Sequence, residues 1–349
     1  MNSKPLSPTG YAFVTCYLGI LLVAGVISQI ITIKVLLVKD NRNKHLTPYL
    51  LNIVASNAII ILGSFPTTFL SSLNNGWYFG DAVCRLDGLL TGIGFTAMIA
   101  TMTYITIKIY LIAKNQYLVI NAETPVQCGR PYMKILIAIW VYSIIAIMPP
   151  VVGLTNMVLE AAKTNCVPDW APKRVPDKIY IVGLTLVAYV LPVSVSFVYL
   201  WKTRLIISLH INLMNDRFMN LKLGNLKNIY RMSAFAVSFF AIAWLPYGLY
   251  VFISVISGKE DFGVEATLVP ALTAKSSVVV NPFIYAVVLP KFRHSILKIL
   301  GLRRRSGGSN SMRSFVHEPV TEMETLRSAG VTRANSRARG NVCKCGKVF

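Results

Sequence analysis

The stretch VEATLVPALTAKSSVVVNPFIYAVV, residues 264–288, decides the fold. It is long enough to cross the hydrocarbon core of a bilayer as a helix, which takes about 20 predominantly apolar residues. Lys275 lies near its middle, where its side chain cannot easily reach water at either end. Because a charge at that depth is costly, a lysine there marks a functional site. The stretch therefore predicts a membrane-spanning helix that carries a functional lysine.

Six further apolar stretches indicate that the chain crosses the membrane seven times. They cover residues 11–37, 49–73, 84–113, 133–155, 178–205 and 230–257. Over the whole chain 54% of the residues are hydrophobic and only 14% are charged, whereas a soluble domain carries about a quarter charged residues. The predicted fold class is therefore an all-α membrane protein, a bundle of seven transmembrane helices.

The lysines and arginines predict the orientation of the bundle, because they collect on the cytoplasmic side of a membrane. With the N-terminus outside, 24 of the 35 fall in inner segments and six in outer ones. We therefore expect a cell-membrane protein with its N-terminus outside and its C-terminus in the cytoplasm. The same bias accounts for most of the net charge of +21 and argues against nucleic-acid binding as its cause. Anionic lipid or an acidic partner is the expected counterpart.

The chain beyond the seventh span divides into two parts. Residues 290–302 have apolar side chains at helical spacing, which predicts a short amphipathic helix on the inner membrane face. From Arg303 onward Ser, Gly, Arg and Thr dominate, a composition typical of disorder. We therefore predict a transmembrane domain over 1–302 and a disordered, basic cytoplasmic tail over 303–349.

Short motifs lie in spans two, four, six and seven. They are Leu-Asn-Ile-Val-Ala-Ser-Asn at 51–57, Trp140 followed by Pro149-Pro150, Phe240 with Trp244-Leu245-Pro246-Tyr247, and Asn281-Pro282-Phe283-Ile284-Tyr285 with Phe292. Together with the seven spans, they resemble the rhodopsin-like G-protein-coupled receptors over residues 11–300. Within that family, Ala274-Lys275-Ser276-Ser277, with the lysine six residues before Asn281, resembles the chromophore site of animal opsins.

The resemblance implies that Lys275 binds retinal covalently as a Schiff base. Its position alone leaves another interpretation open, a lysine paired with an acid for packing or proton relay. The chemistry fits the opsin interpretation, because a desolvated amine is a nucleophile for an aldehyde. The Schiff base must stay protonated to absorb visible light, and this requires a negative charge nearby.

Two acids are candidates for that negative charge. Asp87 is three residues after Cys84, where vertebrate visual opsins have a glutamate counterion. Glu160 is six residues before Cys166, where many invertebrate opsins use an acid. We expect Asp87 to be the main counterion and Glu160 the secondary one. The alternatives are a water-exposed helix cap for Asp87 and an ordinary loop acid for Glu160.

The resemblance also implies a disulfide and a binding pocket. Cys84 and Cys166 are expected to join the outer end of span three to the second outer loop, on the oxidising side of the membrane. The pocket for the polyene is expected to be lined by aromatic side chains, namely Trp244, Tyr247, Tyr189 and Phe240. Trp244 is the best candidate among them for sensing a change in the shape of the chromophore.

The inner half departs from the family pattern. Lys108-Ile109-Tyr110 stands where the family has Asp/Glu-Arg-Tyr, and Leu226 stands where the acidic partner of that arginine is usual. The remaining residues expected to switch, Asn281, Pro282 and Tyr285, match the family. The sequence therefore supports photon capture better than activation of a heterotrimeric G protein.

Three functions remain open. The leading hypothesis is a light-sensing receptor, not an enzyme, that binds retinal in the lipid membrane and signals to a heterotrimeric G protein, with arrestin as a further partner through the tail. The second is a retinal photoisomerase with little or no G-protein coupling. The third is a peptide or small-molecule receptor that happens to carry Lys275. A transporter is disfavoured, because no pair of interrupted helices lies in matching halves of the chain.

Overall fold

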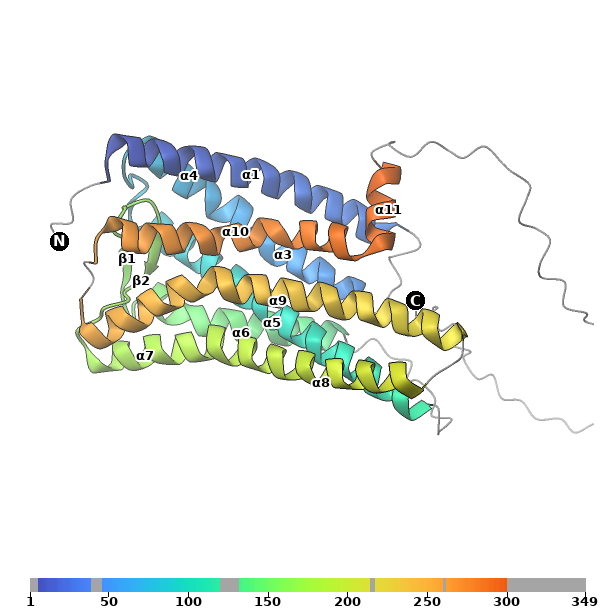
Figure 1. Ribbon diagram of the computed structural model, residues 1–349. Coiled ribbons are helices and arrows are strands. Elements are labelled where there is room, and N and C mark those ends of the chain that lie inside the picture. Colours follow the sequence, from blue (N-terminus) through green and yellow to red (C-terminus); the bar gives the residue numbers. More distant parts are fainter. Residues whose placement is uncertain (1–5, 39–45, 120–131, 214–216, 260–261, 300–349) are drawn as a thin grey trace, which may run out of the picture.

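The structure, a computed structural model, describes residues 6–38, 46–119, 132–213, 217–259 and 262–299. Within these residues seven helical segments are long and apolar enough to cross a membrane, and they run side by side in one bundle (Figure 1). They cover Pro8–Leu37, Thr47–Leu73, Gly80–Asn115, Tyr132–Val151, Val175–Leu209, Leu223–Ser257 and Val264–Val288. The predicted seven-helix membrane bundle is confirmed.

Most spans are single helices, and two are built from shorter pieces. The single helices are α1 (Pro8–Leu37), α5 (Gly80–Val119), α6 (Tyr132–Val151), α9 (Arg217–Ser257) and α10 (Val264–Val288). The second span consists of α3 (Thr47–Gly63) and α4 (Phe65–Leu73). The fifth consists of α7 (Val175–Thr185), the π-helical segment η1 (Leu186–Val190) and α8 (Leu191–Leu213). Such π-helical segments inside α-helices are frequent at functional sites.

The fourth span is shorter than the apolar pattern predicts. α6 ends at Val151 rather than at residue 155. Gly153 follows with a φ of 82°, a left-handed conformation that glycine adopts readily and that commonly ends helices. The chain then enters a loop in which β1 (Met157–Leu159) pairs antiparallel with β2 (Cys166–Pro168). The loop thus begins earlier than expected and has a structure of its own.

The β-hairpin lies at one end of the bundle, beside the start of α1, and α11 (Pro290–Ile299) lies at the other end (Figure 1). Cys166 in β2 forms a disulfide with Cys84 in α5, and the two Cα atoms are 5.3 Å apart. The predicted pairing is therefore confirmed. The disulfide fixes the hairpin against the third span.

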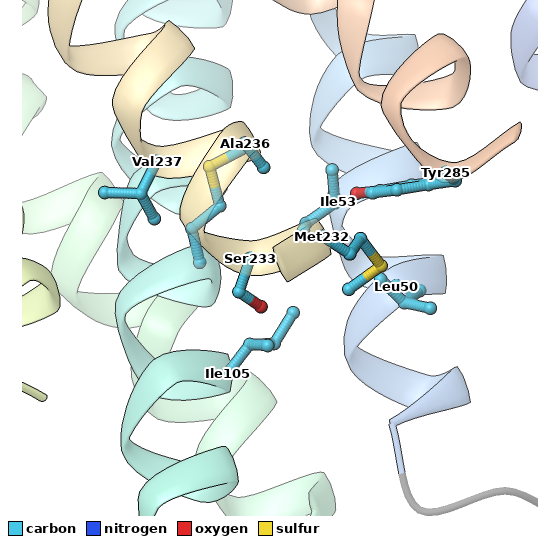
Figure 2. Close-up of a pocket in the computed structure, with 9 residues that line it drawn as sticks. Leu50, Ile53, Ile105, Met232, Ser233, Ala236, Val237 and Tyr285 are labelled. Atoms are coloured by element: carbon cyan, nitrogen blue, oxygen red, sulfur yellow. The ribbon is translucent and has the colours of Figure 1, made fainter. Parts of the chain in front are cut away.

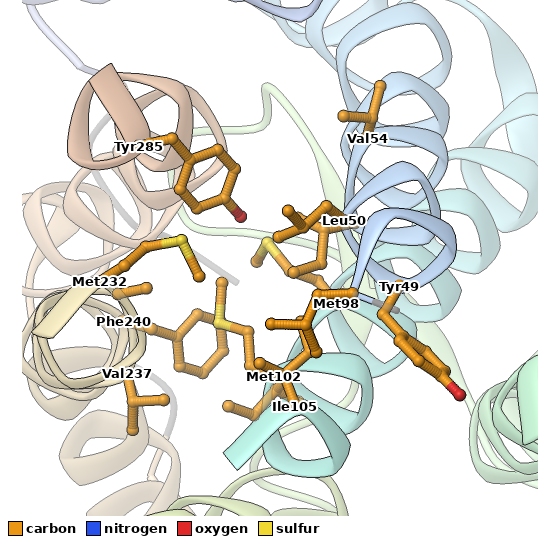
Figure 3. Close-up of a cluster of buried hydrophobic side chains, with 14 of the residues drawn as sticks. Tyr49, Leu50, Val54, Met98, Met102, Ile105, Met232, Val237, Phe240 and Tyr285 are labelled. Carbon is orange, nitrogen blue, oxygen red and sulfur yellow. The ribbon is translucent and has the colours of Figure 1, made fainter. Parts of the chain in front are cut away.

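A hydrophobic cluster joins α3, α5, α9 and α10 inside the bundle (Figure 3). Its members include Leu50, Met98, Met102, Ile105, Met232, Val237 and Tyr285. Methionine is flexible and fills irregular gaps, so this part of the core can repack at modest cost.

The predicted amphipathic helix after the seventh span is present as α11. Phe292 of α11 is buried, and its ring centroid lies 6.0 Å from that of Tyr285 near the end of α10. This contact fixes the start of α11 against the bundle. Residues 300–302, the predicted domain boundary and the tail over 303–349 lie outside the described residues.

Candidate functional site

A cavity of about 160 Å³ lies in the half of the bundle that carries the β-hairpin. Its walls come from α5, β2, the fifth span, α9 and α10, and they are almost wholly apolar. Lys275 is the one charged residue among the described residues that line it. The predicted aromatic residues Tyr189, Phe240, Trp244 and Tyr247 all line the cavity as well. An apolar cavity with a single amine suits an elongated apolar ligand with one reactive polar end.

Lys275 comes from the middle of α10 and is only 5% exposed. Its Nζ lies 5.8 Å from the centroid of the Phe65 ring, where the cation can interact with the aromatic face. Asp87 and Glu160 are the two carboxylates whose charges act on it. Among the described residues the sole ion pair joins Arg174 and Asp177. Lys275 therefore interacts with both acids at longer range than a direct ion pair.

Asp87 is buried beside the disulfide rather than exposed at a helix end. It is 2% exposed and lies one turn after Cys84 in α5. The hydroxyl of Thr67 donates to its Oδ1 at 2.6 Å, and the backbone N–H of Cys166 donates to its Oδ2 at 3.2 Å. Both carboxylate oxygens are thus held by donors from other elements, which excludes the interpretation of Asp87 as a water-exposed cap.

Glu160 directly follows β1 and is buried as well, at 4% exposure. The hydroxyl of Tyr247 donates to its Oε1 at 2.8 Å, and Trp170 Nε1 donates to that hydroxyl at 3.0 Å. Burial raises the pKa of the Glu160 carboxyl, against the opposing effects of the Tyr247 hydrogen bond and the Lys275 charge. An ordinary loop acid would face water, so that interpretation of Glu160 is wrong.

Trp244 of α9 lines the cavity and contacts two other spans. Its ring packs edge-on against Phe95 of α5 with centroids 4.3 Å apart, and it stacks on Phe240 at 5.6 Å. Its Nε1 donates to Ser277 Oγ of α10 at 3.1 Å. A ligand in the cavity that changes shape and displaces Trp244 would therefore alter the contacts of α9 with both α5 and α10.

Several site residues escaped the sequence analysis. Two of them, Phe65 and Thr67, lie near the start of α4. Phe95 lies in α5, and Trp170 lies in the loop that follows β2. Trp170, four residues after Cys166, could have been found from its place next to the predicted disulfide. Thr67 carries no local signal, because it reaches Asp87 only through the packing of α4 on α5.

The residues expected to switch lie apart from the cavity. Asn281 donates to Met98 Sδ at 3.5 Å, and Pro282 follows it inside α10. Tyr285 is buried beside a small space of about 10 Å³, which Ser233 also lines (Figure 2). Ile109 is 1% exposed within the hydrophobic cluster. Lys108 is half-buried, and the ring of Tyr110 lies 5.3 Å from that of Tyr199.

Comparison with known proteins identifies the family. A sequence profile described as "7 transmembrane receptor (rhodopsin family)" matches residues 29–285. Rhodopsin of Alligator mississippiensis is 23% identical over 296 residues, which cover 84% of this chain and 82% of that protein. The green-sensitive opsin of Gallus gallus is 23% identical over 331 residues, which cover 94% of this chain and 91% of that protein. Melanopsin-B of Xenopus laevis is 26% identical over 274 residues, which cover 74% of this chain and 49% of that protein.

A solved structure agrees with these matches. The crystal structure of squid rhodopsin superimposes with a TM-score of 0.73 at 21% identity, and the match covers 86% of this chain and 87% of that one. The structural likeness supports the fold, and the profile match over most of the chain supports the family. This chain therefore belongs to the rhodopsin family of seven-transmembrane receptors, within which it groups with the animal opsins.

Proposed function

We propose that this chain is a light-sensing opsin that holds retinal as a Schiff base on Lys275 and signals through a conformational change. The observation that carries the proposal is a buried lysine that opens onto an apolar cavity and has two buried carboxylates within electrostatic reach. Bound retinal would supply the light absorption and the change of shape. The chain supplies the amine, the charges around it and the walls.

The residues present fit retinal in three respects. Lys275 is not held in a direct ion pair, so its amine is available to an aldehyde. The walls of the cavity are almost wholly apolar and include six aromatic side chains, which suit a polyene. β2 and Trp170, from the loop between the fourth and fifth spans, form part of the cavity wall and add surface that a polyene can contact.

The surroundings of the two acids favour Asp87 as the main counterion. Asp87 accepts hydrogen bonds on both oxygens, from Thr67 and from the Cys166 amide, and such donors stabilise a carboxylate. Glu160 accepts a hydrogen bond from Tyr247 on Oε1, whereas its Oε2 lacks a hydrogen-bond partner in the described structure. We therefore assign the negative charge beside Lys275 to Asp87, with Glu160 as the secondary acid. Because both acids act on one cation, their protonation is coupled.

The attachment can be tested chemically. The purified chain is incubated with retinal in the dark, reduced with borohydride, digested and mapped by mass spectrometry. The expected product is a retinyl group on the peptide that contains Lys275. A retinyl group elsewhere, or none, contradicts the proposed attachment.

The charges support the proposed orientation, and the family supports the proposed partners. The distribution of Lys and Arg supports an outer N-terminus and a cytoplasmic C-terminus. The end of the bundle that carries α11 then faces the cytoplasm, where a heterotrimeric G protein would bind. Arrestin is proposed as a partner of the tail.

A retinal photoisomerase is the second candidate, and one observation favours it. Ile109 occupies the place of the family's arginine and is buried in the hydrophobic cluster, together with Leu226 at the place of the acidic partner. Neither side chain can form the charged contact that this arginine makes in the family. Nucleotide exchange by a G protein under illumination separates the two candidates.

A further inference from the structure

Tyr189 lies in the cavity wall and contacts α9 at Ala241 and at Gly248, on either side of Pro246 along the chain. Its side chain lines the cavity, and it belongs to η1. Its hydroxyl donates a 2.8 Å hydrogen bond to the carbonyl of Ala241 in α9. Its ring also lies beside Gly248, where an added Cβ would come 3.5 Å from Tyr189 Cε1. One side chain therefore spans the segment of α9 that contains Pro246.

Pro246 weakens α9 within this segment. A proline has no N–H, so the carbonyl four residues earlier loses its helical donor. The carbonyls on either side of that one belong to Ala241 and Ala243. The first accepts the hydroxyl of Tyr189 at 2.8 Å, and the second accepts the hydroxyl of Thr273 in α10 at 3.3 Å. Side chains of two neighbouring spans thus hold α9 around the proline.

The two lateral hydrogen bonds are unequal. Thr273 Oγ1 lies closer to the carbonyl of Pro270 in its own helix, at 2.8 Å, than to that of Ala243. Its single hydroxyl proton is therefore directed mainly within α10. Tyr189 has Ala241 as its acceptor at the shorter distance, so it provides the stronger hold on α9.

We propose that Tyr189 is the positioning residue through which the contents of the cavity control the bend of α9. The ring and the hydroxyl move as one rigid body, so a ligand that pushes the ring also breaks the hydrogen bond to Ala241. α9 then loses its stronger lateral hold beside Pro246, and its inner end is released. The inference rests on the proposed function in one respect, that a ligand occupies the cavity.

The first test uses the full chain without retinal, so it does not depend on pigment formation. Nitroxide labels replace the exposed residues Lys114 of α5 and Arg231 of α9, and electron spin resonance measures the distance between them. Tyr189→Phe keeps the ring and removes the hydroxyl. The expected result is a shift of the distance distribution toward longer values. A distribution equal to that of the native chain overturns the proposal.

The matched control is Tyr142→Phe. The hydroxyl of Tyr142 donates to the carbonyl of Val187 in η1 at 2.6 Å, so the same chemical group is lost. Tyr142 neither lines the cavity nor bonds to α9 in the described structure. Its variant is expected to keep the native distances. An equal shift in both variants would mean a general loosening of the bundle and would overturn the proposal.

The second test uses the retinal-loaded chain. Infrared difference spectra with ring-labelled tyrosine are expected to show a light-induced tyrosine band in the native chain and in Tyr142→Phe, and to lose it in Tyr189→Phe. A band that persists in Tyr189→Phe overturns the proposal. If the Phe variant does not fold, Tyr189→Met preserves apolar bulk without the hydroxyl. Failure of the native chain to form a pigment contradicts the proposed function instead, and the distance measurement then decides the role of Tyr189.

Discussion

Single-residue variants can show whether Asp87 or Glu160 is the main counterion of the Schiff base. Each is buried, but Asp87 has donors on both oxygens, whereas Glu160 has a donor on Oε1 and none on Oε2 in the described structure. A negative charge near the buried Schiff base stabilises its protonated form, so loss of the true counterion favours loss of that proton. We predict that Asp87→Asn moves the absorption band at neutral pH into the ultraviolet, and that Glu160→Gln keeps a visible band.

Both variants should be titrated side by side by absorbance. An ultraviolet band for Glu160→Gln with a visible band for Asp87→Asn would reverse the assignment of the two acids. It would leave the attachment to Lys275 intact.

The raised pKa of Glu160 also predicts how stability depends on pH. The folded chain binds this proton more tightly than the unfolded chain does. The stabilising contribution of Glu160 is therefore complete below the ordinary pKa of glutamate and is lost as the pH rises through its raised folded value. We predict that, without retinal, the melting temperature of the native chain falls relative to that of Glu160→Gln as the pH is raised from about 4 to about 8.

The control for this titration is Glu265→Gln, which removes a carboxylate from an exposed position at the start of α10. An equal trend in that variant would mean a general effect of removing a carboxylate and would argue against a specific contribution of Glu160. A gap between the native chain and Glu160→Gln that does not change with pH would argue against the raised pKa.

The sequence could supply the charged residues of the site but not their contacts. Lys275, Asp87 and Glu160 were found because each lies at a fixed distance along the chain from a motif or a cysteine. Thr67 was missed, because it reaches Asp87 only across the contact between α4 and α5. Trp170 lies four residues after Cys166, but its hydrogen bond to the Tyr247 hydroxyl, which in turn binds Glu160, also joins separate elements. Contacts of this kind depend on how helices pack, which no local pattern encodes.

Among the elements, the β-hairpin depends on its disulfide. Cys84 and Cys166 are separated by 82 residues, so the bond closes a long loop and restricts the unfolded chain. We predict that Cys84→Ala or Cys166→Ala lowers the free energy of unfolding by about 2–5 kcal/mol. Yield and thermal half-life in detergent measure this effect. Cys16→Ala serves as the control, because Cys16 is exposed and free. Single variants of the disulfide that match Cys16→Ala in both measurements would show that the bond is dispensable.

The elements were predictable to different degrees. The seven spans follow from the length of their apolar runs, since the bilayer requires such runs. The β-hairpin and η1 carry no comparable signal, because a three-residue strand is too short to show a period and a π-helical segment has the composition of its helix. η1 matters for function, because it carries Tyr189 into the cavity wall.

At the scale of the whole molecule, the inner half of the bundle has apolar side chains at the two positions where the family has an arginine and its acidic partner. Ile109 and Leu226 are 1% and 3% exposed in the same hydrophobic cluster. Opening the inner end would expose these apolar side chains to water, which costs about 25 cal/mol for each Å² of apolar surface exposed. We predict that illuminated, retinal-loaded protein stimulates nucleotide exchange on a heterotrimeric G protein at least about tenfold less than a coupling rhodopsin does, a free-energy difference of about 1.4 kcal/mol.

Purified protein in nanodiscs, with and without light, provides this comparison. Exchange as fast as that of the coupling rhodopsin would show that other inner residues replace the missing arginine. It would also remove the main support for a photoisomerase.

The absorption spectrum of the purified chain after addition of retinal, recorded before and after illumination, shows most directly whether Lys275 binds retinal. We predict a visible band that changes with light in the native chain and in Lys173→Ala, which removes an exposed lysine. We predict no such band in Lys275→Ala, even though that variant still folds and remains in the membrane. A normal visible band from Lys275→Ala would contradict the assignment of this site to retinal.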